Sequence, residues 1–289
     1  MRTVSPWPDS LVRAIARQDF ILFVGSGVSA SCRNVRGDGP PGWFELIEKT
    51  ATVLSRRIAE ERVVKRAKSD LLDAAELLFF EASKEGKLTD VLERIAVAVE
   101  GPSDDSFLPG AWHDELLSLD PLLILTTNYD RILERSTKSG FNVIRPDATN
   151  VGREIRNGNP TIIKIHGTID DKQSMVLSHS QYAELRSRGR HMFEVLRALF
   201  LTRTCLFVGY SLGDPDIRLL LESLASDRSV ESAHYLLGPT PEHTHLKELF
   251  RKTYGVSMVE YPRGEHAKGL ALLQQLVKSV EGARVGATV

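Results

Sequence analysis

Residues 20–30 read FILFVGSGVSA, and this stretch decides the fold class. Its first five residues form an uninterrupted apolar run, which is typical of a strand buried on both faces of a parallel sheet. The next six residues satisfy the pattern G-x-G-x-x-A, which directly behind a strand is typical of a loop that approaches a phosphate group. The stretch therefore predicts a Rossmann-like α/β fold.

Short apolar runs of the same kind recur along the chain, each followed by a turn signal. Longer segments with helical periodicity lie between them, and strands that alternate with helices predict a doubly wound parallel sheet. The further predicted strands are LLILTTN (122–128), TIIKIHG (161–167), CLFVGYS (205–211), HYLLG (234–238) and VSMVEYP (256–262).

Two helical insertions interrupt this alternation. Residues 31–121 are far more than one crossover connection requires, and their pattern is mostly helical. A smaller helical excursion covers about residues 170–200. The chain has 289 residues, and one core usually stops growing at roughly 250–300 residues. We therefore expect a single domain over 1–289, in which the two insertions wall a pocket above the sheet.

Composition excludes several classes of protein. Lys and Arg number 37 against 38 Asp and Glu, so the basic excess of a dedicated nucleic-acid binder is missing. No segment has the roughly 20 apolar residues that span a bilayer, and the N-terminus lacks a secretory signal, so we expect a cytoplasmic protein. The two cysteines are too few for a four-thiolate zinc site, and His179, His234, His243 and His245 lack convergent ligand spacing. No metal is expected.

The glycine loop offers both space and hydrogen-bond donors to an anion. Gly25 permits a tight turn, and the missing side chain at Gly27 lets the backbone approach a pyrophosphate. Ser26 and Ser29 add hydroxyl donors, and Ala30 allows close packing of a following helix. The alternative is a glycine turn with a purely structural purpose.

An ordinary dehydrogenase would carry an acidic residue at the end of a second strand about 20 residues farther on, where it holds a ribose. Glu45 and Glu48 lie in a helical pattern instead. This difference argues against a conventional hydride-transfer enzyme.

The remaining candidate site residues follow the predicted strands. In open α/β sheets ligands bind outside the carboxyl ends of the strands, and three strand ends are unusually polar. They read Asn128-Tyr129-Asp130, His166-Gly167 and Gly209-Tyr210-Ser211-Leu212-Gly213-Asp214. Each alone is compatible with an ordinary turn, but together with the glycine loop they predict one binding site. Asp214 and Asp216 flank a proline at a helix start, where capping explains them.

The motifs GSGVS, TTNYD, IHG and FVGYSLGDPDI, in this order, resemble those of the sirtuin-like NAD-consuming family, and specifically of its bacterial branch. PGWFEL at 41–46 also resembles the segment that follows the glycine loop in that branch. The motifs extend from Gly25 to Ile217, and FVGYSLGDPDI is the most specific of them. The chain departs from protein-deacylating sirtuins, because two cysteines cannot build their four-cysteine zinc module.

This resemblance implies that NAD is a substrate, which is cleaved at the nicotinamide–ribose bond to nicotinamide and ADP-ribose. Such a reaction passes through an oxocarbenium-like ribose. Asn128 would position the attacking water, His166 would be the base, and Asp130 would support them. Gly209 and Ser211 would contact the NAD, together with Gly25, Ser26, Gly27 and Ser29 of the glycine loop.

Two alternatives stay open. One is a zinc-free, NAD-dependent protein deacylase, and the other is a non-catalytic module that binds NAD or ADP-ribose. The resemblance also implies an antiphage effector that depletes NAD, often encoded with a HerA-type ATPase. Because an unregulated enzyme of this kind would poison its host, we expect activation by a separate partner or by homo-oligomerisation.

Overall fold

The computed structural model describes residues 6–137, 140–225 and 234–286, and its centre is a parallel sheet of seven strands in the order β3-β4-β2-β1-β5-β6-β7. The strands are β1 (Phe20–Val24), β2 (Leu123–Thr126), β3 (Asn142–Ile144), β4 (Thr161–Lys164), β5 (Thr204–Val208), β6 (His234–Pro239) and β7 (Val256–Tyr261). All six strand pairings are parallel. This confirms the predicted doubly wound Rossmann-like sheet.

Strand β1 is the centre of the sheet, as its apolar sequence predicts. It pairs with β2 on one side, where Leu22 lies opposite Ile124, and with β5 on the other, where Leu22 lies opposite Leu206. The strands β2, β3 and β4 extend the sheet on one side of β1, and the chain then crosses to β5 on the other side, so the strand order reverses beside β1 and a crevice forms at the carboxyl ends of these strands. The site residues that follow these strands therefore meet at the same edge.

The six predicted strands are present, but the sequence interpretation missed β3. This edge strand has only three residues, and Asn142 and Val143 are exposed. Because it is neither long nor continuously apolar, it lacks the pattern by which the other strands were recognised.

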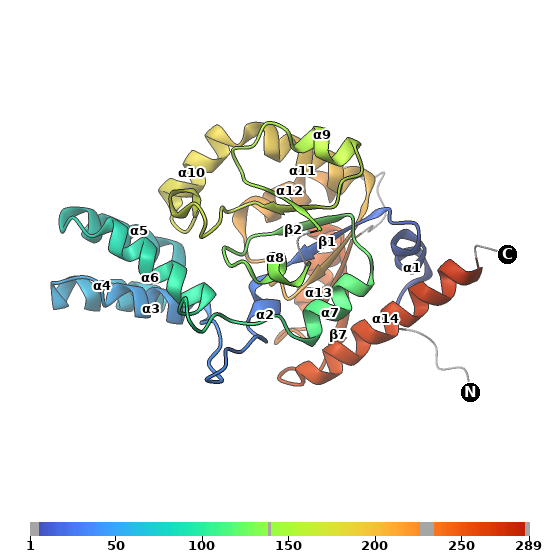
Figure 1. Cartoon of the computed structure of the whole chain (residues 1–289), viewed down its shortest axis with the longest axis horizontal. Helices are drawn as coiled ribbons and strands as arrows, with labels where there is room; N and C mark the ends of the chain where they lie inside the picture. The colour runs from blue at the N-terminus through green and yellow to red at the C-terminus, as the bar shows by residue number, and fades with distance from the viewer. Residues whose placement is uncertain (1–5, 138–139, 226–233, 287–289) are drawn as a thin grey trace.

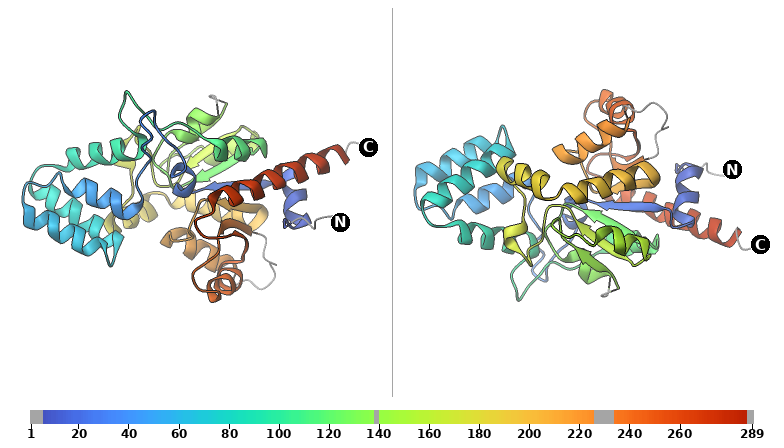
Figure 2. Two further views of the ribbon diagram at one scale, coloured as in Figure 1. Left: turned by 90° about the horizontal axis from the view of Figure 1, so that it is seen from below. Right: turned by 90° about the horizontal axis from the view of Figure 1, so that it is seen from above.

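Helices cover both faces of the sheet (Figure 2). Alternate residues of β1 point to opposite faces: Phe20 and Leu22 contribute to one core, and Ile21 and Phe23 to the other. The first core is covered by α1 (Asp9–Ala16), α7 (Ala111–Ser118) and α14 (His266–Gly286). The second is covered by α9 (Val151–Arg156), α11 (Arg190–Thr202), α12 (Pro215–Ala225) and α13 (His245–Tyr254).

A separate group of helices lies at one end of the molecule, opposite α1 and α14 (Figures 1 and 2). This helical lobe consists of α3 (Trp43–Ala51), α4 (Arg57–Ala67), α5 (Leu71–Lys84) and α6 (Leu88–Glu100). It has a core of its own, which also takes in Tyr129 after β2 and Ile169 and Leu177 after β4. The lobe therefore packs directly on the loops that follow the sheet strands.

Three short elements complete the fold near the carboxyl edge of the sheet. They are α2 (Ser26–Ser29), α8 (Ile132–Ser136) and the 3-10 turn η1 (Lys172–Ser174), and η1 is followed by α10 (His179–Arg188). α10 packs against α5 of the lobe. None of the helices among the described residues is long and apolar enough to cross a membrane.

Candidate functional site

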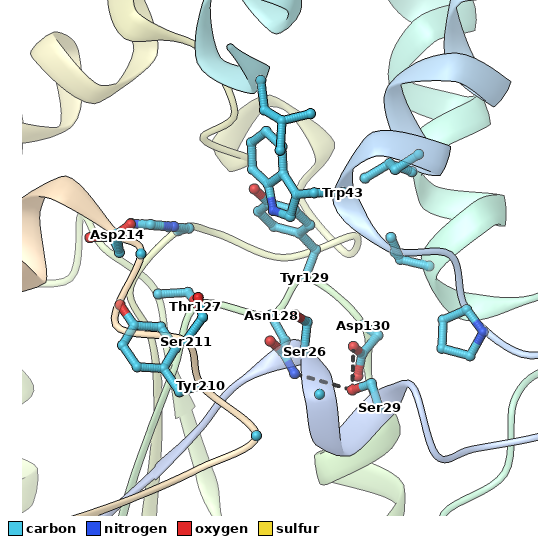
Figure 3. Close-up of a pocket in the computed structure, with 18 of the residues that line it drawn as sticks. Ser26, Ser29, Trp43, Thr127, Asn128, Tyr129, Asp130, Tyr210, Ser211 and Asp214 are labelled. Atoms are coloured by element: carbon cyan, nitrogen blue, oxygen red, sulfur yellow. Dashed lines mark hydrogen bonds and ion pairs between the residues drawn. The ribbon is translucent and has the colours of Figure 1, made fainter. Parts of the chain in front are cut away.

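A cavity of about 500 Å³ opens at the carboxyl ends of β1, β2, β4 and β5 (Figure 3). This volume is in the range of small-molecule sites. Its polar side chains come from the strand-end loops: Ser26, Ser29, Thr127, Asn128, Asp130, His166, Ser211 and Asp214. Its apolar wall comes mostly from the helical lobe and the segment before it: Pro40, Pro41, Trp43, Leu46, Leu71, Leu72 and Val99.

The structure brings nearly all of the sequence-predicted site residues together. Asn128, His166 and Asp130 line the cavity, and so do Ser26, Gly27, Ser29, Gly209 and Ser211. Gly25 does not line it and lies behind the other glycines, against the backbone of Gly209.

The glycines hold two strand-end loops together. The Gly25 N–H donates to the Val208 carbonyl at 2.9 Å, and the Gly27 N–H donates to the Gly209 carbonyl at 2.8 Å. A Cβ on Gly27 would lie 2.8 Å from that same oxygen, and Gly209 has φ +63° with only 2.5 Å between its own would-be Cβ and the Val28 nitrogen. The missing side chain at Gly27 thus permits a close approach to the β5 loop, and the predicted approach of a pyrophosphate to Gly27 stays a prediction.

The helix that follows the glycine loop is a single turn. α2 ends at Ser29, and the next helix begins only at Trp43. The intervening segment turns away from the sheet and carries Pro40 and Pro41 to the cavity wall. Ala30 therefore packs no long helix against β1.

Asn128 is held by a buried chain of hydrogen bonds (Figure 3). Its side-chain nitrogen donates to Ser29 Oγ at 3.1 Å, and the Ser29 hydroxyl donates to Asp130 Oδ2 at 3.0 Å. All three residues are buried. Because the amide nitrogen is directed to Ser29, the amide oxygen is the atom that Asn128 offers to the cavity. Ser29, predicted as a donor to an anion, instead uses its proton on Asp130.

Hydrogen bonds to β1 and from Lys164 of β4 hold the loop that carries Asn128. The Asn128 N–H donates to Thr126 Oγ1 at 3.0 Å, and that hydroxyl donates to the Val24 carbonyl of β1 at 2.8 Å. The fully buried Lys164 ammonium donates to the carbonyls of Tyr129 and Asp130 and to Glu134 Oε1, the last at 2.7 Å.

Asp130 is a buried carboxylate with several partners. Besides the Ser29 hydroxyl, it accepts the Ile132 N–H at 3.0 Å. Burial raises the pKa of the Asp130 carboxyl, although Lys164 and these hydrogen bonds act in the opposite direction. The predicted support of Asn128 by Asp130 thus has a structural route through Ser29.

His166 faces the cavity from the loop after β4. Its ring lies edge-on to Tyr182, with centroids 5.0 Å apart, and its Nε2 lies 3.3 Å from Asp214 Oδ2. The angles are not those of a hydrogen bond, and Nε2 is buried without another partner. Burial lowers the pKa of His166, and Asp214 and Asp216 oppose this effect. A neutral imidazole of this kind can accept a proton at physiological pH.

Sequence reasoning missed the second role of Asp214. The capping interpretation is correct for Oδ1, which accepts the N–H groups of Asp216 and Ile217 at 3.1 and 2.9 Å. Oδ2 points to the other side, towards His166, and accepts the Tyr182 hydroxyl at 2.6 Å. The place of Asp214 on a strand-end loop was a usable signal, whereas nothing in the sequence around Tyr182 pointed to the site.

Among the residues that the structure describes, one group of side chains that could hold a metal ion lies outside the cavity. Asp70, Asp73 and His179 place their ligand atoms within 4.8 Å of one another at the junction of α5 and α10, although the sequence spacing of His179 indicated no convergence. Asp73 is already paired with Arg66 and with His179.

The two cysteines are buried. Burial raises the pKa of the Cys32 thiol to about 11 and also raises that of Cys205. Neither thiol is activated as a nucleophile.

Comparisons with known proteins match the part of the chain that carries most of this site. Residues 122–259 match the family model described as SIR2-like domain. NAD(+) hydrolase ThsA of Enterococcus faecium is 26% identical over 214 residues, which cover 73% of this chain and 41% of that protein. NAD(+) hydrolase ThsA of Acinetobacter baumannii (strain 532279) is 23% identical over 219 residues, 75% of this chain and 41% of that protein. Defense-associated sirtuin 2 of Bacillus subtilis is 24% identical over 212 residues, 70% of this chain and 19% of that protein.

The chain spans about two fifths of the length of the two ThsA proteins and about one fifth of the Bacillus subtilis protein. The matched region contains the loops after β2, β4 and β5, which carry Asn128, His166 and Ser211. The resemblance inferred from the motifs is thereby confirmed: residues 122–259 match a SIR2-like domain, and the similar proteins include NAD(+) hydrolases and a defence-associated sirtuin.

Proposed function

We propose that this protein binds NAD+ and hydrolyses its nicotinamide–ribose bond, which gives nicotinamide and ADP-ribose. The observation that carries the proposal is the meeting of Asn128 and His166 in one cavity at the carboxyl edge of the sheet. The names of the ThsA relatives as NAD(+) hydrolases support it.

The proposed reaction uses two groups of the cavity. As the bond from ribose C1′ to the nicotinamide nitrogen breaks, the bonding electrons leave with neutral nicotinamide, so no general acid is needed. The Asn128 amide oxygen accepts a hydrogen bond from the attacking water, whose oxygen bonds to C1′. His166 takes the proton that this water releases. One water is consumed and one proton is released to solvent when His166 is regenerated.

The charged groups of the cavity suit the cationic nicotinamide end of NAD+. Among the described residues that line it, two are aspartates, Asp130 and Asp214, and none is lysine or arginine. The nicotinamide ring of NAD+ and the oxocarbenium-like ribose both carry positive charge, which carboxylates stabilise at short range. The tryptophan and leucines of the apolar wall suit the face of a planar ring.

The biological setting is a second part of the proposal. Because relatives include a protein named Defense-associated sirtuin 2, we infer that NAD+ loss serves antiphage defence by abortive infection in the cytoplasm. We infer as well that a separate partner, such as a HerA-type ATPase, or homo-oligomerisation switches the activity on.

The test is chromatography of NAD+ incubated with purified protein, alone and with the candidate partner. Asn128→Ala and His166→Ala are expected to lose at least about 100-fold in kcat, with NAD+ still bound in a calorimetric titration. The exposed Asn157→Ala and His243→Ala serve as matched controls and should retain full activity. Equal turnover by Asn128→Ala and wild type would refute the site assignment.

The same assay separates the alternatives. NAD+ binding without product in either condition favours a binding module. Nicotinamide release that depends on an added acyl-lysine peptide favours a deacylase.

A further inference from the structure

We propose that Asp214 is a positioning residue for His166, and that the Tyr182 hydroxyl holds the Asp214 carboxylate in place for this task. The inference rests on the proposed function only in that it gives His166 the role of base. The contacts that carry it come from three separate parts of the fold: the loop after β5, the loop after β4 and helix α10.

The first step is that Asp214 is fixed by the start of α12. Its Oδ1 accepts two backbone N–H groups, from Asp216 at 3.1 Å and from Ile217 at 2.9 Å. These are donors that a helix start leaves without partners inside the helix, so the carboxylate is held against a rigid element. A capping role explains this oxygen completely.

Capping does not explain the other oxygen. Asp214 Oδ2 accepts the Tyr182 hydroxyl at 2.6 Å and lies 3.3 Å from His166 Nε2. The side chains of Asp214 and His166 are 6% and 4% exposed, so the pair is almost withdrawn from water. A carboxylate oxygen has two lone-pair positions. The Tyr182 hydroxyl takes one, and the second is the position that an Nε2–H of His166 would take once the 3.3 Å contact is aligned.

The number of donors that already face the two Asp214 oxygens favours a positioning role over substrate binding. Oδ1 has two donors, and Oδ2 has one donor and faces a second. Protein donors thus occupy three of the four acceptor positions of Asp214, and the fourth faces His166 Nε2. Asn128 differs, because its amide oxygen is left for the cavity.

Tyr182 contacts both members of the pair. Its ring packs edge-on against the His166 ring at 78°, and its hydroxyl bonds to Asp214. Because Tyr182 lies on α10, which packs on α5, the orientation of the His166–Asp214 pair depends on how the helical lobe sits over the sheet.

The charges around His166 fit this arrangement. Asp214 faces it from the loop after β5, and Asp216 faces it from α12, where its own carboxylate is paired with Arg186 of α10 at 2.7 Å. Tyr182 is the titratable group that faces it from α10. A proton taken up by His166 thus creates a cation directly beside a fixed carboxylate, which stabilises the transition state for proton transfer.

An Nε2–H directed at Asp214 also selects one tautomer. The lone pair of the neutral ring is then on Nδ1, which is the nitrogen that accepts the proton. The long and poorly aligned 3.3 Å contact in the free protein is expected to shorten once the ring is charged.

The test uses nuclear magnetic resonance of histidine-labelled full chain, with the His166 signals assigned by their loss in His166→Gln. In wild type, the neutral His166 ring should be the Nε2–H tautomer. Asp214→Asn preserves the helix cap but removes the charge, so the His166 pKa should fall. Tyr182→Phe keeps the ring contact but releases Oδ2 to pair more strongly with His166, so the pKa should rise. Asp9→Asn, in the exposed first turn of α1, should leave both the tautomer and the pKa of His166 unchanged.

Opposite shifts in the two variants support the inference, because a merely structural role gives no such pair of changes. Shifts in the same direction, no shift, or a neutral Nδ1–H tautomer in wild type would overturn it. These readouts do not depend on NAD+ turnover, so a protein that fails to cleave NAD+ refutes the proposed function and leaves this result readable.

Where NAD+ is cleaved, Asp214→Asn should lower kcat about 100-fold with little change in KM. It should also move the acid limb of the kcat profile to lower pH. A rise in KM at unchanged kcat would instead assign Asp214 to substrate binding and overturn the positioning role.

Discussion

Replacing Ser29 with alanine tests how Asn128 is held. The Ser29 hydroxyl joins two buried partners, since it donates to Asp130 Oδ2 at 3.0 Å and accepts from Asn128 Nδ2 at 3.1 Å. Ser29→Ala removes both hydrogen bonds and leaves both partners in place. The side chain of Ser29 itself is small, so little apolar contact is lost.

The magnitude follows from the two orphaned groups. A hydrogen bond to a charged acceptor contributes about 1.5–3 kcal/mol, and an unsatisfied buried donor costs about 1–3 kcal/mol. Because the cavity adjoins both groups, water can replace part of the loss. We expect the free energy of unfolding to fall by about 3 kcal/mol, and kcat to fall about 10- to 100-fold as the Asn128 amide loses its orientation.

Urea unfolding and steady-state NAD+ cleavage measure the two effects. Ser118→Ala is the matched control, because this exposed serine has one hydrogen bond, to a backbone carbonyl of its own helix. A change in stability of no more than about 0.5 kcal/mol is expected there. If Ser29→Ala instead raised KM and left kcat and stability intact, Ser29 would contact a substrate anion as the sequence suggested, and the positioning argument would fail.

Three further predictions concern the frame of the site. Gly209→Ala should lower the free energy of unfolding by more than about 2 kcal/mol in thermal or urea melts. Gly264 has φ +82°, but a Cβ there would have no neighbour within 4 Å. Gly264→Ala should therefore lower the free energy of unfolding by less than Gly209→Ala, and the difference measures the steric clash of the Gly209→Ala methyl group with Val28. Lys164→Met should destabilise by about 3 kcal/mol, since it leaves buried oxygens without a cation; a stability equal to wild type would contradict that reasoning. Burial lowers the pKa of His113 and His234 from 6.5 to about 4. The folded state therefore binds fewer protons than the unfolded state between these values, and stability should fall as pH drops from 6.5 to 4, by about 3 kcal/mol for each histidine. If the urea midpoint did not change between pH 6.5 and 4, this pH dependence of stability would be excluded.

Periodicity and strand-end chemistry were sufficient to predict the fold class and most of the polar side chains that line the cavity. The run FILFV is buried at every position, and it pairs on both sides as a continuous apolar strand must. Asn128 and His166 were found because parallel strands end at one edge, so residues far apart in sequence meet there. The edge strand β3 was missed, because three residues, of which two are exposed, are too few to show either an apolar run or an alternation.

The roles inside the cavity were decided by tertiary contacts. The sequence singled out Gly27 and Ser29 as neighbours of an anion. The structure adds contacts that the motif did not indicate: Gly27 hydrogen-bonds to the β5 loop, and Ser29 hydrogen-bonds to Asn128 and Asp130. A motif states which residue types are present, whereas the direction of a hydroxyl or an amide depends on partners 99 and 101 residues away.

Asp214 shows most clearly which contacts the sequence predicted and which only the tertiary structure revealed. Its position before α12 was enough to predict a helix cap, because capping is a local interaction with the next few N–H groups. Its second oxygen meets His166 and Tyr182, which local sequence does not place beside it. By itself the sequence determined the sheet, the edge at which ligands bind and the residue types at that edge, since these follow from short-range periodicity. Only the packing of the loops and α10 against one another decided which atoms face the cavity, because that depends on contacts between segments far apart in the chain.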